Sequence, residues 1–103
     1  ASLLFRLDQL PCFTQWKNTG AETDGYVTGL EPATNFPNPR SFETNQHRVV
    51  TLEPGAGFDV DLQLIVHTTA DAVAEAEAAV AEIGGNRITT LLDKPRPGWT
   101  PGA

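Results

Sequence analysis

The sequence predicts a mostly β protein, an antiparallel β-sandwich with one surface helix. The first observation behind this prediction is that apolar residues recur at strict period two over 58–66. The apolar members of that alternation share one face of a strand: Phe58, Val60, Leu62, Leu64 and Val66. The second is that only one stretch, about 69–83, is rich in strong helix formers. Several strand-like segments against one helix favour an antiparallel architecture.

Strands are expected in four further places. Residues 2–7 alternate, residues 10–17 are extended with Pro11 near their start, and residues 26–30 contain aromatic and β-branched side chains. A short strand is expected over 87–92. The strongest pairing predicted is a hairpin in which residues 47–52 pair with 58–66 across the turn residues 53–57, burying the apolar face and exposing Asp59 and Asp61.

The helix has clear end signals. Thr68 with Asp71 fits a capping box, Thr69 is an equally good cap, and Gly84-Gly85 ends the helix. A narrow apolar stripe predicts a surface helix resting on a sheet edge: Val73, Ala76, Val80 and Ile83. A proline-rich tail, 94–103, follows.

Residues 31–46 contain three prolines and three asparagines, so we expect no regular structure there. Compact domains seldom keep so long an irregular segment unless it has a function. This segment is therefore where a site is expected.

Composition excludes several classes of function. A net charge of −6 with scattered basic residues argues against nucleic-acid binding. No apolar stretch approaches the roughly 20 residues that a membrane span needs. The single cysteine, Cys12, cannot form an internal disulfide and is expected to be a buried structural thiol in a cytoplasmic protein. No cofactor motif or metal-ligand cluster is present, and we read Asp59 and Asp61 as solvated.

An ordered set of motifs resembles a known family. Leu10-Pro11 and Thr14-Gln15-Trp16-Lys17 precede Gly29-Leu30-Glu31-Pro32, and an Asn/Pro loop, Leu52-Glu53-Pro54-Gly55 and the alternating strand follow. In this order they resemble the C-terminal part of aldose 1-epimerases, over roughly residues 3–67. The similarity is greatest to the uncharacterised bacterial branch of that family. The resemblance implies a galactose mutarotase-like supersandwich, of which residues 1–103 would be the C-terminal portion.

The resemblance also implies a chemistry. In characterised members a Glu at the position of Glu31 is the general base, and a His from an earlier strand is the acid. Here His47 and His67 both follow Glu31, and we interpret them as surface or edge residues. The acid would then come from elsewhere, so activity is expected only when an N-terminal portion completes the fold.

Four other residues are candidates for sugar binding. Trp16 could stack on a sugar face or pack in a core, and Lys17 and Arg40 could bind hydroxyls or an anionic substituent or remain solvated. Asn35 is either a ligand or a turn former. For Glu31 itself, a capping or surface role is the alternative.

The expected partners are a sugar and either the missing N-terminal polypeptide or a second copy of the chain. The absence of methionine and the apolar start at Leu3 favour part of a larger domain, although removal of an initiator methionine would explain the former. Two alternatives to the isomerase remain: a non-catalytic carbohydrate-binding or structural module, and another lyase or isomerase activity on the same fold.

Overall fold

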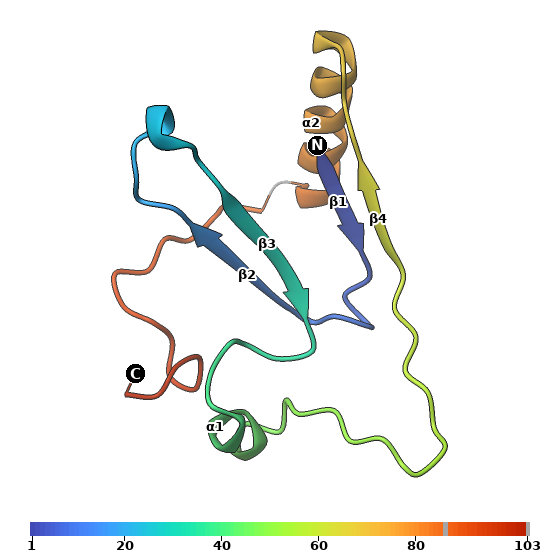
Figure 1. Cartoon of the computed structure of the whole chain (residues 1–103), viewed down its shortest axis with the longest axis vertical. Helices are drawn as coiled ribbons and strands as arrows, with labels where there is room; N and C mark the ends of the chain where they lie inside the picture. Colours follow the sequence, from blue (N-terminus) through green and yellow to red (C-terminus); the bar gives the residue numbers. More distant parts are fainter. Residues whose placement is uncertain (86, 103) are drawn as a thin grey trace.

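The structure, a computed structural model, describes residues 1–85 and 87–102 (Figure 1). These residues form two separate two-stranded antiparallel sheets together with helices. In chain order the elements are β1 (Ser2–Phe5), β2 (Cys12–Lys17), the 3-10 turn η1 (Glu22–Asp24), β3 (Thr28–Ala33), α1 (Arg40–Asn45), β4 (Leu62–Ile65) and α2 (Ala70–Gly84).

The first sheet pairs the first strand of the chain with the last one. β1 pairs antiparallel with β4, with Leu3 opposite Leu64 and Phe5 opposite Leu62. The predicted hairpin between 47–52 and 58–66 is therefore wrong: residues 47–52 are not a strand, and only 62–65 of the second segment are. The turn itself is present, since Ala56 N–H donates to the Glu53 carbonyl at 2.9 Å. At the start of the segment, Arg48 N–H donates to the Glu43 carbonyl at 3.0 Å instead of to a neighbouring strand, and β4 is paired with β1.

The second sheet is the β2–β3 hairpin, and both of its strands were predicted. Trp16 lies opposite Gly29, and Thr14 lies opposite Glu31. β3 extends to Ala33, beyond the predicted 26–30, and includes Pro32. A two-stranded sheet has only edge strands, where a proline without an N–H is tolerated.

The prediction that residues 31–46 lack regular structure is wrong for both of its ends. β3 continues into the segment, and α1 occupies Arg40–Asn45. Pro39 directly precedes α1, and a missing N–H has no cost near a helix start. Within 31–46, irregular structure is limited to residues 34–39, which connect β3 to α1, and to Gln46.

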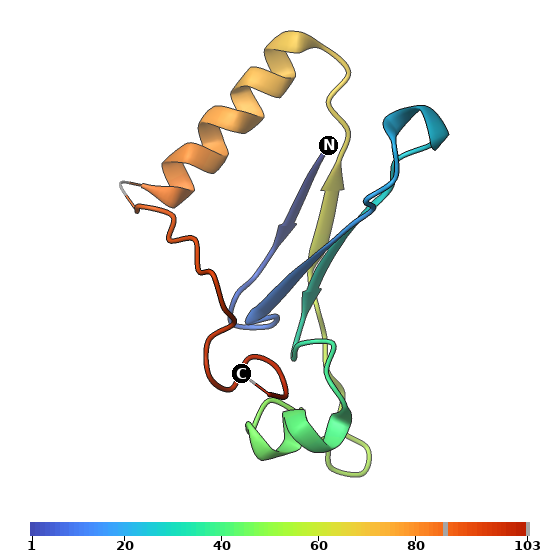
Figure 2. The same cartoon turned by 90° about the vertical axis from the view of Figure 1, so that its left-hand side faces the viewer.

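α2 confirms the predicted helix. Thr69 is its cap, because Ala72 N–H donates to Thr69 Oγ1 at 3.2 Å, and Gly85 takes a positive φ of 56° at its end. The helix stands off the β1–β4 sheet on one side of the molecule (Figure 2). The strand predicted over 87–92 is absent from the described residues, and Ile88 and Leu91 there are more than nine-tenths exposed.

The core is sparse. Among the described residues, Leu10 and Cys12 are the buried apolar side chains, so the prediction that Cys12 is buried is confirmed. The alternating face of 58–66 is exposed instead of buried, with Leu64 at 70% and Val66 at 71%. The reason is that no second sheet within the described residues covers it. Asp59 and Asp61 are exposed as predicted.

The two sheets touch where β1 leads into β2. The rings of Phe5 and Phe13 are stacked with their centroids 5.8 Å apart, and Asp61 N–H donates to Gln9 Oε1 at 3.0 Å. The radius of gyration is 16.9 Å, against about 13 Å for a compact domain of this length. Antiparallel pairing is thus present as predicted. The prediction of a mostly β sandwich is not confirmed, because helix (24%) and strand (20%) are about equal and the strands form two separate two-stranded ribbons. None of the described helices is long and apolar enough to cross a membrane.

We predict that the isolated chain self-associates through the exposed apolar face of β4. Replacing Leu64, which is 70% exposed, with Thr should weaken association about tenfold, because burying one Leu side chain contributes free energy of that order. Sedimentation velocity over a concentration series measures this. Ile88→Thr, which changes an exposed side chain that belongs to neither sheet, is the control. An 11.1 kDa monomer at every concentration would contradict the prediction.

Candidate functional site

Glu31 and Trp16 lie on the same face of the β2–β3 hairpin. Alternation along each strand and the observed register place Trp16, Gly29 and Glu31 on one side. A Cβ atom built on Gly29 would lie 2.6 Å from Glu31 Oε1 and 3.4 Å from Trp16 Cβ. The carboxylate of Glu31 therefore occupies the space that a side chain at position 29 would take, beside Trp16.

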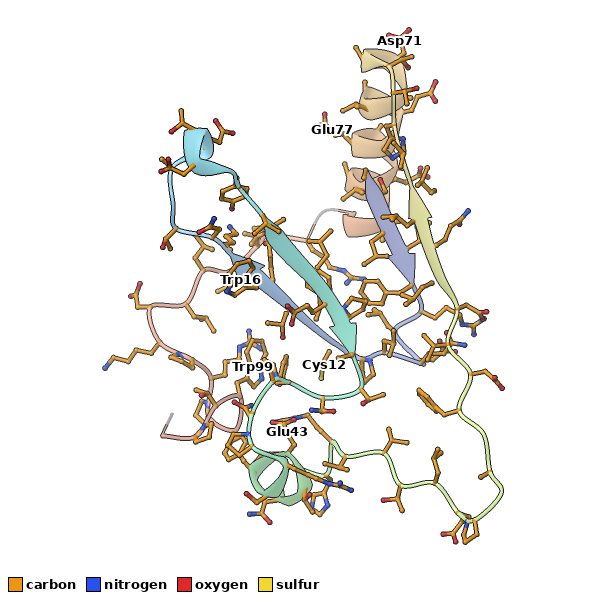
Figure 3. All side chains as sticks on the ribbon, in the orientation of Figure 1. Cys12, Trp16, Glu43, Asp71, Glu77 and Trp99 are labelled. Atoms are coloured by element: carbon orange, nitrogen blue, oxygen red, sulfur yellow. The ribbon has the colours of Figure 1, made fainter. Side chains whose placement is uncertain are left out.

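Both groups are accessible to a ligand. Trp16 is 52% exposed, and Glu31 is exposed. Figure 3 shows Trp16 on the ribbon formed by β2 and β3. The face therefore presents a carboxylate beside an aromatic ring, both open to solvent.

Lys17 does not join this face. It follows Trp16 in β2 and pairs with Thr28, so alternation directs it to the other side of the hairpin. Glu31 and Lys17 are therefore not brought together.

Asn35 and Arg40 lie beyond the end of β3. The Asn35 side chain accepts from Thr34 Oγ1 at 3.2 Å and donates to the Phe36 carbonyl at 2.8 Å, as a turn-forming Asn does. Arg40 is exposed at the first residue of α1. Within residues 1–85 and 87–102, no hydrogen bond or ion pair joins either of them to Glu31.

The histidines lie on other elements. His67 follows β4, is half-buried, and its Nε2 lies 2.8 Å from Ser2 Oγ. His47 follows α1, is exposed, and has a positive φ of 57°. In the described part of the chain, neither forms a hydrogen bond with Glu31.

The best-built polar cluster surrounds Glu43, and sequence reasoning missed it. Glu43 on α1 is 0% exposed. Arg48 donates to it from Nε and Nη2, both at 2.7 Å, Asn38 Nδ2 donates at 2.8 Å, and Phe36 N–H donates at 3.1 Å. No periodic pattern marked Glu43 and Arg48. Their opposite charges five positions apart were the only available indication, and such pairs are common on solvated surfaces.

The protonation of these groups follows from their contacts. The hydrogen bonds from Arg48 hold the pKa of Glu43 at about 2, with further lowering by Asn38 and Phe36 N–H, while burial acts in the opposite direction. The same hydrogen bonds raise the pKa of Arg48. Burial raises the pKa of the Cys12 thiol, which agrees with a structural role for that residue.

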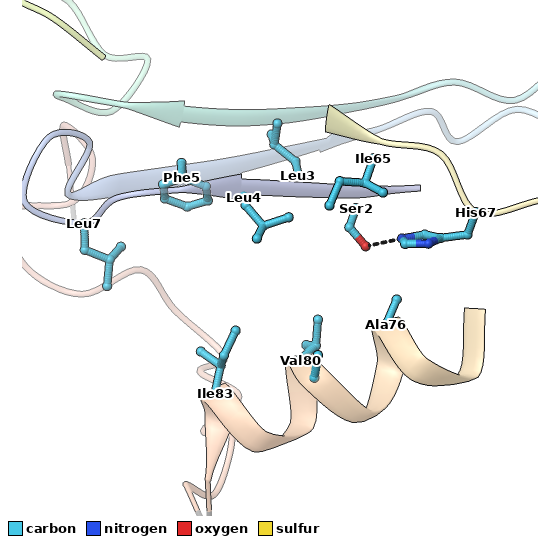
Figure 4. A pocket seen from close by; sticks show the side chains of 11 residues that line it. Ser2, Leu3, Leu4, Phe5, Leu7, Ile65, His67, Ala76, Val80 and Ile83 are labelled. Carbon is cyan, nitrogen blue, oxygen red and sulfur yellow. Dashed lines mark hydrogen bonds between the residues drawn. The ribbon is translucent and has the colours of Figure 1, made fainter. Parts of the chain in front are cut away.

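Separate from Glu31, an apolar groove of about 460 Å³ lies between β1 and α2 (Figure 4). Leu4, Ile65, Ala76, Val80 and Ile83 line it, and its polar side chains, Ser2 and His67, are bonded to each other. In the parts of the chain that the structure describes, no three His, Cys, Asp or Glu side chains gather as metal ligands.

Comparison with known proteins gives one family. The family model described as "Domain of unknown function (DUF4432)" matches residues 1–66, more than half of the chain. The chain belongs to the DUF4432 family. No curated protein and no solved structure matches it. The DUF4432 region contains Trp16, Glu31 and the Glu43–Arg48 pair, whereas α2 and the tail lie after it.

The pKa of Glu43 in this DUF4432 chain predicts how stability depends on pH. The folded value of about 2 lies below the ordinary value of 4.5. The contribution of the ionised carboxylate to the free energy of unfolding is therefore complete above about pH 5 and is lost as pH falls towards 2. The stability difference between wild type and Glu43→Gln should shrink over that range, because a protonated Glu43 resembles Gln.

Denaturant midpoints of the two proteins, followed by circular dichroism at a series of pH values, measure the difference. Glu77→Gln, which removes an exposed carboxylate from α2, is the control. A difference for Glu43→Gln that stays constant down to pH 2 would contradict the assignment of the low pKa to this residue.

Proposed function

We propose that this chain supplies the base-bearing, C-terminal part of an aldose 1-epimerase-like sugar isomerase. The observation that carries the proposal is the Glu31 carboxylate beside the exposed ring of Trp16 on the open face of the β2–β3 hairpin. The order of motifs around Gly29-Leu30-Glu31-Pro32 supports the same reading. A free aldose or a related sugar is the proposed substrate.

The proposed reaction opens and recloses the sugar ring. Glu31 removes the proton of the anomeric hydroxyl, whose electrons form the C=O bond while the bond from C1 to the ring oxygen breaks. An acid on the far side of the sugar gives a proton to the ring oxygen. Rotation about the bond next to C1 and reversal of these steps yield the other anomer. Trp16 would hold the C–H face of the sugar against the sheet.

Neither histidine of the sequence is placed to act as this acid. His47 and His67 lie on other elements, and His67 is bonded to Ser2. We therefore propose that an N-terminal companion or a second copy of the chain completes the site. Covering the exposed β1–β4 face would also supply the second sheet of a supersandwich. The buried free thiol of Cys12 is in keeping with the proposed cytoplasmic location.

The alternative is a module that binds carbohydrate without converting it. The exposed Trp16 ring favours binding, and the lack of a histidine bonded opposite Glu31 in the described residues favours the absence of catalysis. Sugar binding without interconversion of anomers, in an assembly with its companion present, would decide for this alternative.

Replacing Glu31 by Gln tests the proposal. In the complete assembly this change keeps the shape of the side chain but removes the base, so anomer interconversion should fall by about 10²–10⁴-fold. Polarimetry or NMR measures the rate, and thermal melts should show an unchanged fold because Glu31 is exposed. Activity within a few-fold of wild type would remove Glu31 from the mechanism.

Two variants serve as controls for this experiment. Glu53→Gln neutralises an exposed carboxylate in a turn away from the hairpin and should leave the rate unchanged. Gly29→Ala keeps the charge of Glu31 but displaces its carboxylate, since the new Cβ would lie 2.6 Å from Glu31 Oε1. A rate that falls with Gly29→Ala and not with Glu53→Gln would show that the position of the carboxylate matters.

A further inference from the structure

The tail of the chain returns to α1 and is bound there through its main chain. Figure 1 shows the C-terminal segment beside α1, far from α2. Arg48 Nη2 donates to the carbonyl of Gly98 at 2.8 Å, and Asn38 Nδ2 donates to the carbonyl of Trp99 at 2.8 Å. Two successive carbonyls are thus bound by two side chains from a segment some 50 residues earlier.

Both donors are oriented by one atom. Arg48 Nη2 and Asn38 Nδ2 each also donate to Glu43 Oε1, at 2.7 and 2.8 Å. Among the described residues, Glu43 itself forms no hydrogen bond with the tail, because its carboxylate and the tail carbonyls are all acceptors. Its role is to hold the two donors at the positions that the carbonyls of Gly98 and Trp99 require.

Aromatic contacts and a glycine complete the fit. The Trp99 ring packs against the Phe36 ring with centroids 5.4 Å apart. The Arg48 guanidinium lies over the Phe36 ring, with its Cζ 5.1 Å from the ring centroid. Gly98 has a φ of 80°, and a Cβ there would lie 2.7 Å from Gln46 Oε1. Few residues other than glycine adopt this conformation without strain.

We infer that residues 96–99 form a latch, that Glu43 is its positioning residue, and that the latch fixes the loop of residues 34–38. This loop follows β3, the strand that bears Glu31, and contains both Phe36 and Asn38. Phe36 N–H is itself bonded to Glu43 Oε2. The docked tail therefore holds the backbone that leaves the Glu31 strand, and this inference does not depend on the sugar chemistry.

Acrylamide quenching of Trp99 fluorescence tests the latch in a Trp16→Phe background of the full chain. Glu43→Gln should shift the docking equilibrium about tenfold or more towards the free tail, since a hydrogen bond to a charged group has an effect of that order. Arg48→Lys should do the same, because Lys cannot reproduce the two-atom contact. Glu77→Gln should leave quenching unchanged. Unchanged quenching in both latch variants would overturn the inference.

Gly98→Ala changes the tail and not α1. It therefore distinguishes release of the tail from a loss of structure in α1. It leaves Glu43, Arg48 and Asn38 in place but strains the backbone at a positive φ, so quenching should rise. Amide hydrogen exchange at Phe36 and Asn38 should then accelerate, while circular dichroism stays unchanged. A released tail with unchanged exchange at both amides would show that the latch does not fix the loop and would overturn that part of the inference.

Discussion

The ion pair between Glu43 and Arg48 is the contact on which the region formed by residues 34–48 and 96–99 depends. Among the described residues, three side chains are buried, and Glu43 is the only charged one. Burying a carboxylate is costly unless hydrogen bonds replace its hydration. Here Arg48, Asn38 and Phe36 N–H supply them, and no buried side-chain N or O atom in the described residues lacks a partner. The loop and the short helix meet at this carboxylate, and two of its donors, Arg48 and Asn38, also bind the tail.

The chain after this pair has little regular structure until β4. Residues 49–61 contain a turn but no helix or strand, and β4 then pairs with β1. That pairing leaves an apolar sheet face and the groove beside α2 uncovered. The hairpin that bears Glu31 and Trp16 is likewise open on one side. The proposed isomerase would need a companion to cover both of these exposed faces.

Local features were predictable and pairings were not. A run of helix formers after a Thr cap identifies α2, and aromatic and β-branched residues identify the β2 and β3 segments. These features could be predicted because each depends on only a few neighbouring residues. Period-two alternation tells which residues share a face but not what covers that face, so alternation by itself does not decide whether Leu64 is buried or exposed. The placement of Lys17 opposite to Trp16 follows from alternation alone. The burial of Glu43 depends on Asn38, Arg48 and the distant tail together, and no sequence window contains all of them.

A double-mutant cycle on Glu43 and Arg48 tests the central claim most directly. Glu43→Gln, Arg48→Met and the double variant are compared by the free energy of unfolding from denaturant titrations. If the pair organises this region, each single variant leaves the other charge buried without its partner, and the double variant is no less stable than the worse single one. Losses that simply add would show that the two residues act independently, and would contradict the account.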